Sequence, residues 1–217
     1  MDAQKLNALM DRAVDDADLV SAEIPSIDLY LEQILQLVTD KGYEGSATVD
    51  RALTKNMINN YSKDGLITPV KGKKYSKEQI VQMLAVYSLK NTLSIEEIGR
   101  VMQSIYASEA YTGQGLIAAY DKAIAVKQAQ KHRCPETVRE IMAAEQLDPE
   151  NGEDYFAMLL ATAALSAYFR NIAKAMLEEF PLPESEEEKK AREKEEKRAR
   201  KEAKKKAEEE SSSEENA

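Results

Sequence analysis

The chain has 217 residues, of which 43% are hydrophobic and 32% charged, with 39 acidic against 30 basic side chains. This length suits one domain or two small ones. The single cysteine and single histidine, Cys134 and His132, exclude a disulfide framework, a cysteine-cluster zinc site and a multi-histidine metal centre. We find no secretory signal, no apolar run of ~18 residues that would span a membrane, and few glycines and prolines. The composition therefore predicts a cytoplasmic, mostly helical protein that uses neither a membrane nor a cofactor.

The first fifty residues predict two helices. Residues 1–22 are polar with a weak helical repeat, which predicts a short, loosely held helix. Ser26 or Asp28 is the expected N-cap of the next helix, whose apolar face begins at Leu29. Residues 43–50 are expected to form a loop.

A third helix is predicted from about residue 53, with Thr54 as its N-cap and Asp64-Gly65 as its glycine stop. The next segment, 66–75, is β-prone on either side of Gly72, which predicts a small two-stranded wing. Two capping boxes then begin two further helices. These boxes are Ser76 with Gln79, and Ser94 with Glu97.

The second half of the chain is alanine-rich and helical. Gly113 and Gly115 are interpreted as a flexible hinge before a helix that continues to about residue 132, and Pro135 begins the next helix. A long apolar helix is predicted over residues 153–180. This helix either forms a dimer interface or packs within its own subunit.

Basic residues are concentrated in one part of this acidic chain. Between residues 51 and 77 the only acidic residue is Asp64. The basic residues of this segment are Arg51, Lys55, Lys63, Lys71, Lys73, Lys74 and Lys77. Because DNA responds to the field within about one Debye length, ~8–10 Å, the segment is compatible with DNA binding despite the formal net charge of −9.

The helix predicted after Thr54 separates apolar from polar side chains. Met57, Ile58 and Tyr61 fall on its inner side. Its outer side carries Lys55, Asn56, Asn59, Asn60 and Lys63. Asparagine pairs bidentately with adenine in the major groove and lysine reaches guanine or phosphate, so this side has the donors and acceptors of a recognition helix. An ordinary polar helix surface is the alternative.

Three lysines near Gly72 form a compact cationic tip on the predicted wing. They are Lys71, Lys73 and Lys74. Lysines grouped in this way suit the phosphate backbone of a duplex, which favours DNA as the partner.

No residue pattern predicts catalysis. His132 and Cys134 are close in sequence, but they lie in a polar junction between helices that offers no third catalytic partner. Gly113-Gln-Gly115 is too short for a dinucleotide-binding fingerprint. We therefore expect no catalytic residues and no metal site.

The order of residues in TKNMINNYSKDGLITPVKGKKYSKEQI, followed by LSIEEIGRVM, resembles the DNA-binding domain of MerR-type regulators. The resemblance implies a recognition helix that ends in an aromatic residue, then a turn, a basic wing and a pair of helices. The cysteines of metal-sensing members are missing, so metal sensing is not implied. The matching positions are Tyr61, Gly65, Leu66, Pro69, Tyr75, Ile95, Glu97 and Ile98.

The chain is more closely similar to a bacterial family known as domain of unknown function 1836. This similarity covers about residues 23–106 and is carried by IPSIDLYLEQI, LTKNMINNY, KKYSKEQI and LSIEEI. It implies a transcriptional regulator with a winged helix-turn-helix. In contrast to MerR-type proteins, about a dozen residues separate the first two helices, and Asn59-Asn60 stands where an arginine is usual.

Together these observations predict a mostly α fold: a MerR-like winged helix-turn-helix with a small β-wing, a helical C-terminal module and a charged tail. The expected regions are 1–22, a DNA-binding domain at 23–106, a helical module at 107–180 and a low-complexity tail at 181–217. The tail has almost no apolar residue and cannot bury a core. The expected function is sequence-specific binding of double-stranded DNA by a homodimer, to regulate transcription, with an effector that the sequence does not identify. The alternative is a helical protein–protein adaptor.

Overall fold

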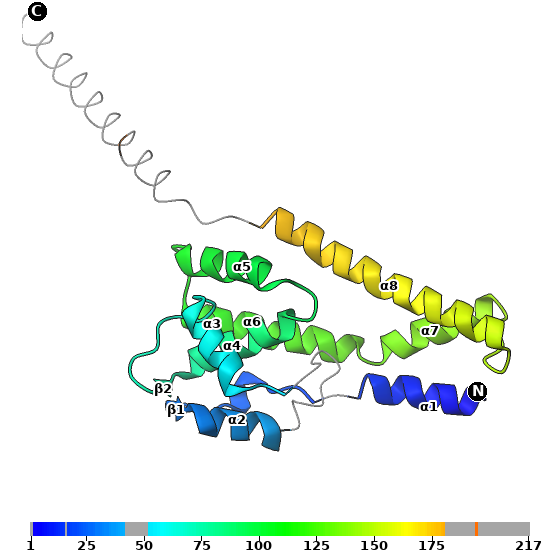
Figure 1. Ribbon diagram of the computed structural model, residues 1–217, viewed down its shortest axis with the longest axis horizontal. Coiled ribbons are helices and arrows are strands. Elements are labelled where there is room, and N and C mark those ends of the chain that lie inside the picture. Colours follow the sequence, from blue (N-terminus) through cyan, green and yellow to red (C-terminus); the bar gives the residue numbers. More distant parts are fainter. Residues whose placement is uncertain (1, 16, 42–51, 181–193, 195–217) are drawn as a thin grey trace, which may run out of the picture. The chain divides into compact units, whose positions relative to one another are not determined.

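The computed structural model describes residues 2–15, 17–41, 52–180 and 194. The chain divides into two units, Met1–Pro181 and Leu182–Ala217, and the elements labelled in Figure 1 all lie in the first. The expectation of a mostly helical protein with a small two-stranded sheet is confirmed. In chain order the elements are α1 (Ala3–Ala13), a short 3₁₀ turn η1 (Ser21–Glu23), β1 (Leu29–Tyr30), α2 (Leu31–Asp40), α3 (Lys55–Lys63), β2 (Lys74–Tyr75), α4 (Lys77–Leu89), α5 (Ile95–Ala107), α6 (Gly113–Gln130), α7 (Arg133–Ala144) and α8 (Gly152–Glu178).

Helix α4 is the centre of the hydrophobic core. Apolar side chains are buried on nearly every side of it, and Val81, Leu84 and Tyr87 are fully inaccessible to solvent. Helices α3 and α6 and strand β2 pack directly against it. Burial of a side chain of this size stabilises a fold by about 1.5–3 kcal/mol. The core that surrounds α4 therefore fixes the positions of the elements that carry the basic residues.

Helix α6 joins this same core and also holds the N-terminal segment. Its Ile117, Tyr120 and Ile124 belong to the core cluster around α4. The Tyr120 hydroxyl donates to the Leu19 carbonyl over 2.9 Å, and the backbone N–H and hydroxyl of Ser21 donate to the Asp121 carboxylate over 2.9 and 2.6 Å. Core contacts thus continue past residue 106, where the predicted DNA-binding domain ends. The domain boundaries themselves remain a prediction.

The capping signals in the sequence are largely confirmed. Thr54 caps α3, and the expected boxes begin α4 and α5. The N-cap of α2 is a correction: neither Ser26 nor Asp28 caps it, and Tyr30 is the cap residue, whose N–H donates to the Gln33 side chain over 2.8 Å. A glutamine at the third helical position satisfies the cap N–H without a hydroxyl at the cap itself.

The two-stranded sheet differs from the predicted wing. Strand β2 pairs antiparallel with β1, with Leu29 opposite Tyr75 and Tyr30 opposite Lys74, so Leu29 lies in a strand and not on a helix. The prediction that residues 66–75 fold back on themselves as a hairpin is wrong. Proline at position 69 has no N–H to donate to a ladder, and side chains of α4 satisfy the neighbouring backbone groups.

The predicted hinge at Gly113 and Gly115 is also wrong. Both glycines lie in the first turn of α6, where the Thr112 hydroxyl accepts from the Gly115 N–H over 2.9 Å. A side chain at Gly113 would collide with the side chain of Glu78 on α4, so close packing explains this glycine. The loop predicted at 43–50 lies outside the described residues.

Helix α8 is present as predicted, but little of it is covered by its own subunit. Of its side chains only Met158 and Leu177 are buried. By length and composition α8 could cross a membrane, with a mean hydropathy of 1.3 over an 18-residue stretch, which corrects the expectation that no segment would qualify. Alanines between its larger apolar residues keep the hydropathy of this stretch high without one unbroken run of large side chains.

Candidate nucleic-acid interface

Helix α3 has a well-defined start and end. The Thr54 hydroxyl accepts from the Met57 N–H over 3.3 Å. At the other end the Leu66 N–H donates to the Tyr61 carbonyl over 2.9 Å, across Gly65, whose φ is +69°. This is the Schellman arrangement, in which glycine takes a left-handed conformation that other residues adopt only with strain. The nine-residue helix is thus held in a fixed register.

That register places polar and apolar side chains of α3 on opposite sides. Ile58 and Tyr61 are buried in the core, and Met57 is half-buried. All five polar residues predicted for the outer side are exposed. They are Lys55, Asn56, Asn59, Asn60 and Lys63. Residues 56, 60 and 59, 63 are spaced by four, so their side chains form two adjacent rows on one surface.

Tyr61 anchors α3 and has an unusual hydroxyl. The ring is 4% exposed, and its hydroxyl is the one buried side-chain oxygen or nitrogen without a hydrogen-bond partner among the residues that the structure describes. Burial raises the pKa of Tyr61 to about 12, because the ionised form loses its hydration. The neutral ring serves as a hydrophobic anchor for the helix.

The loop between α3 and β2 is held by two buried glutamines of α4. Gln82 accepts from the Thr68 N–H over 2.8 Å, and Gln79 donates to the carbonyls of Thr68 and Pro69 over 3.2 and 2.9 Å. The backbone here makes its hydrogen bonds to side chains in place of a strand partner. The start of the loop is therefore fixed to the core helix, and its basic tip projects from a fixed base.

A tyrosine–carboxylate pair supports these glutamines. Gln82 donates to Glu78 over 3.0 Å and to the Tyr111 hydroxyl over 3.1 Å, and Tyr111 donates a very short hydrogen bond to Glu78. Burial, with a smaller effect from the Glu78 carboxylate, raises the pKa of Tyr111 to about 12. Tyr106 meets Tyr111 edge-on, and its hydroxyl donates to the Leu66 carbonyl over 2.9 Å. The network therefore also holds the chain directly after α3.

Beyond this base the loop presents exposed lysines. Lys71 and Lys73 are exposed on either side of Gly72, whose φ of +80° allows the tight turn there. Lys74 in β2 is also exposed, and its ammonium lies 4.9 Å from the ring centroid of Tyr30 in the paired strand. A cation–π contact at an exposed site contributes about 0.5–1 kcal/mol and orients the lysine without neutralising it.

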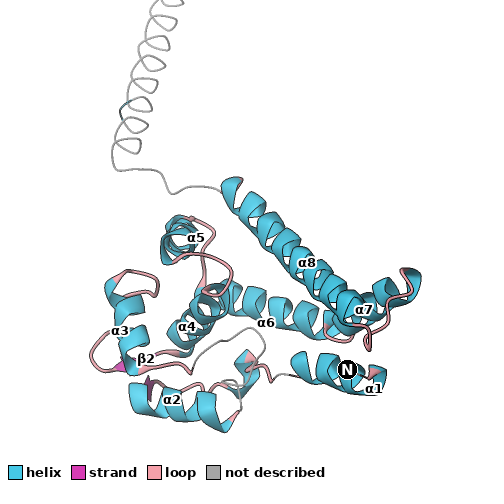
Figure 2. Ribbon diagram, turned by 45° about the vertical axis from the view of Figure 1, so that its right-hand side comes forward, coloured by secondary structure: helices cyan, strands magenta, loops and turns pink. Residues whose placement is uncertain are grey.

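The first turn of α2 connects the two groups of basic residues. Lys55 of α3 approaches the Glu32 carboxylate at 3.6 Å, and Lys74 of β2 lies over Tyr30, the cap of the same turn. Figure 2 shows α3, both strands and α2 next to one another. The eight predicted residues thus lie exposed on adjoining elements, which we call the basic surface: Lys55, Asn56, Asn59, Asn60, Lys63, Lys71, Lys73 and Lys74. Two basic residues of the segment 51–77 are not part of this surface: Lys77 begins α4 and is half-buried, and Arg51 is outside the described residues.

Several residues that shape this surface were not expected from the sequence. Tyr30 and Glu32 contact its lysines, and Gln82 holds its loop. A glutamine within an otherwise apolar helix such as IVQML was the available signal for Gln82, because a buried amide needs partners. No local signal in the sequence indicates that Tyr30 faces Lys74, since the strand pairing joins residues 44 positions apart.

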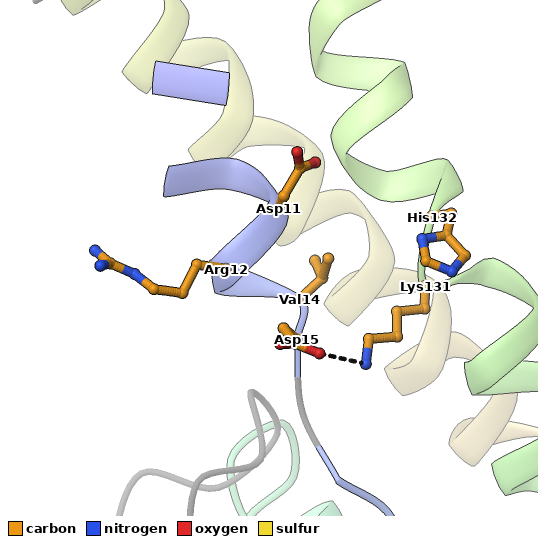
Figure 3. A pocket seen from close by; sticks show the side chains of 6 residues that line it. All are labelled: Asp11, Arg12, Val14, Asp15, Lys131 and His132. Carbon is orange, nitrogen blue, oxygen red and sulfur yellow. Dashed lines mark hydrogen bonds and ion pairs between the residues drawn. The ribbon is translucent and has the colours of Figure 1, made fainter. Parts of the chain in front are cut away.

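A cleft of about 440 Å³ lies elsewhere, between α1 and the junction of α6 with α7 (Figure 3). It is lined by side chains of both charges, and Asp15 pairs with Lys131 across it at 3.2 Å. The residues around it are Asp11, Arg12, Val14, Asp15, Lys131 and His132. Within the described ranges, no group of three or more His, Cys, Asp or Glu residues is placed to hold a metal ion. None of the described residues that line the cleft belongs to the basic surface.

Comparison with known proteins bears on the same half of the chain. No curated protein and no solved structure matches the sequence. One family model matches the chain, over a range that contains β1, α2, α3, β2, α4 and α5 and ends within α6. Residues 19–123, and with them the whole basic surface, match the family described as a domain of unknown function, DUF1836.

Proposed function

We propose that the basic surface binds double-stranded DNA in a sequence-specific manner and that the protein regulates transcription. The observation that carries this proposal is the joint exposure of four asparagine and lysine residues on α3 and three lysines on the adjoining loop and strand. These are Asn56, Asn59, Asn60 and Lys63, with Lys71, Lys73 and Lys74. Each asparagine supplies a donor and an acceptor for a base edge, and each lysine a cation for a phosphate.

In this proposal α3 is the recognition helix of a MerR-like helix-turn-helix and enters the major groove. Its outer rows point away from the core, and its axis is fixed by Tyr61 and the Schellman end. The loop after it contacts the phosphate backbone beside the groove. Strand β1 takes the place that the second strand of a wing would have, so Tyr30 and Lys74 approach the backbone together.

The competing function is a protein–protein adaptor, and the exposed apolar face of α8 is the observation that favours it. The two functions differ in how binding depends on salt. DNA affinity falls steeply with salt, with a log–log slope of about −0.9 for each neutralised phosphate, whereas adaptor binding through apolar contacts varies little.

The proposal is tested by separating the two parts of the surface. Lys73→Ala with Lys74→Ala should weaken binding to all duplexes by a similar factor and reduce the salt slope by up to about two. Asn59→Ala should lower affinity for the preferred duplex by roughly 1–3 kcal/mol and affect random DNA little, because a base-edge contact forms only in register. Fluorescence anisotropy of the full chain across a salt series measures both.

A matched control removes two exposed lysines outside the surface, Lys5 in α1 and Lys122 in α6. Lys5→Ala with Lys122→Ala changes the net charge by the same amount and should leave affinity and slope unchanged. If the control and the Lys73, Lys74 variant behave alike, only net charge matters and the proposed surface is wrong. If neither surface variant changes affinity, the adaptor function replaces DNA binding.

A further inference from the structure

Helix α8 carries an exposed apolar side chain at every fourth position along almost its whole length. This row, which we call the α8 ridge, consists of Phe156, Leu160, Ala164, Tyr168, Ile172 and Met176. Its large members are between 54% (Leu160) and 70% (Met176) exposed. A residue row with this spacing winds slowly around a helix and forms one continuous ridge.

The ridge has a two-fold pattern along the sequence. Ala164 lies at its centre, with Leu160 and Tyr168 four residues away on either side and Phe156 and Ile172 eight residues away. Reversal of the helix about Ala164 therefore places Leu160 on Tyr168 and Phe156 on Ile172, whereas Met176 falls opposite Gly152 and lies outside this pairing. Self-complementarity of this kind is what a two-fold interface requires, because residue i must meet residue j while j meets i.

We propose that the α8 ridge packs against the α8 ridge of a second copy of the chain, antiparallel and crossing at Ala164. Ridges of this spacing interdigitate when two helices cross at about 50°, the commonest packing of helices in globular proteins. The small side chain at the crossing point lets the two backbones approach. Leu160 of each copy then meets Tyr168 of the other, and Phe156 meets Ile172.

The exposed area is sufficient for a stable dimer. Leu159 and Phe169, 58% and 73% exposed, flank the ridge. With about 150–250 Å² for a fully exposed side chain of this size, the ridge and its flanks expose roughly 800 Å². An interface of standard size buries about 800 Å² on each partner, so this exposed area is of the size that a dimer needs, and it exceeds the apolar patch of a typical monomer, about 300–600 Å².

A membrane is the rival partner, and the attachment of α8 at both ends argues against it. Met158 is buried near the start of α8, a helix that packs against α7. Near its end, Leu177 belongs to the main core cluster and Lys174 pairs with Glu97 of α5 at 3.1 Å. A membrane span needs about 20 residues, so insertion of this 27-residue helix would pull at least one of these anchors out of the body. A second copy covers the ridge and leaves both anchors in place.

The association state of the full chain tests the ridge. Wild-type protein should sediment as a dimer at about 10 μM, a concentration well above the dissociation constant of most standard-size interfaces. Leu160→Glu with Tyr168→Glu should sediment as a monomer with unchanged helix content by circular dichroism, since both side chains are exposed in the single subunit. The control, Thr162→Glu with Ser166→Glu, adds the same charge at exposed positions off the ridge and should remain dimeric.

Crosslinking tests the position of the two-fold axis. With Cys134→Ser to remove the exposed native cysteine, Ala164→Cys should form an intersubunit disulfide on mild oxidation, because two residues on the axis bring their Cβ atoms close together. Ser166→Cys in the same background should not. A dimer that crosslinks equally at both positions, or at neither, has its interface elsewhere and overturns the proposal.

The remaining outcomes also decide the matter. A monomeric wild type contradicts the proposal, and if it also binds phosphatidylcholine vesicles through α8, the partner is a lipid surface. A dimer that survives the Leu160, Tyr168 variant contradicts it as well. None of these readouts uses DNA, so the dimer and the DNA-binding function can fail independently of each other.

Discussion

Helices α4 and α8 are both rich in apolar residues, yet the apolar side chains of α4 are buried and most of those of α8 are exposed. The first is surrounded by α3, α6 and β2, so that Leu84 and its apolar neighbours are inaccessible to solvent. The second is anchored at Met158 and Leu177 and leaves Leu160 and the rest of its ridge exposed. Apolar composition indicates that a helix needs to be covered, but it does not indicate by what. Tertiary contacts among the residues that the structure describes answer that question for α4, and they do not answer it for α8.

The largest expected effect contrasts one leucine from each helix. Leu84→Ala should lower the free energy of unfolding by about 2–5 kcal/mol, because it opens a cavity in the fully packed core. Leu160→Ala should change it by no more than about 0.5 kcal/mol at the lowest protein concentration at which unfolding can be followed. Urea denaturation of both variants measures the difference. Equal losses would mean that α8 belongs to the subunit core and would remove the contrast.

The next effect concerns the polar part of α4. Gln82→Met keeps the side-chain volume but leaves the Thr68 N–H without its acceptor, which should destabilise the protein by about 1–3 kcal/mol. Because Gln82 fixes the base of the basic loop, affinity for random duplex DNA should fall too. Gln103→Met on the exposed side of α5 serves as the control and should be within about 0.5 kcal/mol of wild type. If Gln82→Met left the free energy of unfolding unchanged, the loop would not depend on this amide.

A smaller effect of opposite sign is expected at Tyr61. Tyr61→Phe removes a buried hydroxyl that has no partner among the described residues, so it should raise the free energy of unfolding by about 1 kcal/mol. Tyr120→Phe provides the contrast, since its hydroxyl is bonded to the Leu19 carbonyl and its loss should destabilise by about 0.5–1.5 kcal/mol. Loss of stability in both variants would imply that Tyr61 has a partner in the folded protein.

Two tyrosines with raised pKa values, Tyr61 and Tyr111, make the stability depend on pH in the alkaline range. Burial raises the pKa of Tyr61 and of Tyr111 to about 12 from about 10 in an unfolded chain. Their contribution is therefore fully present below pH ~10 and is lost as pH rises through ~12, since the unfolded chain releases these protons first. The urea midpoint of the wild type should fall between about pH 9 and 12, and the midpoint of Tyr61→Phe should fall less steeply over the same range. An identical slope in the two proteins would exclude Tyr61 as a contributor.

The smallest effect is expected where the chain continues past α8. Truncation after Pro183 removes a segment with almost no apolar residue, so the thermal midpoint of the remainder should stay within about 2 °C of the full chain. Differential scanning calorimetry on both proteins measures this. A larger shift would show that the tail packs on the body and would identify it as a rival cover for α8.

Local signals in the sequence predicted local structure well. Thr54, Gly65 and the Ser76 and Ser94 boxes begin or end helices where the sequence places them, because each acts through hydrogen bonds within one or two turns. The outward position of the residues in the basic surface follows from the same helical register. These features needed no knowledge of the rest of the chain.

Long-range structure could not be predicted in this way. The partner of β2 lies 44 residues earlier in the chain, and a two-residue strand such as Leu29-Tyr30 carries no period that distinguishes it from the start of a helix. Gly113 was interpreted as a hinge because its neighbour, Glu78, is supplied by another helix. The contacts of Lys74 with Tyr30 and of Lys55 with Glu32 depend on the same distant packing.

The central claim is that the surface formed by α3 and the loop after it reads DNA sequence, and selection from a random duplex library tests it most directly. The full chain should enrich duplexes that share a common motif and bind them at least about 10³-fold more tightly than random DNA at physiological salt. Asn59→Ala should reduce that ratio, and Lys73→Ala with Lys74→Ala should leave it nearly unchanged while weakening both. No enrichment after repeated rounds, or no duplex binding at low salt, would contradict the claim.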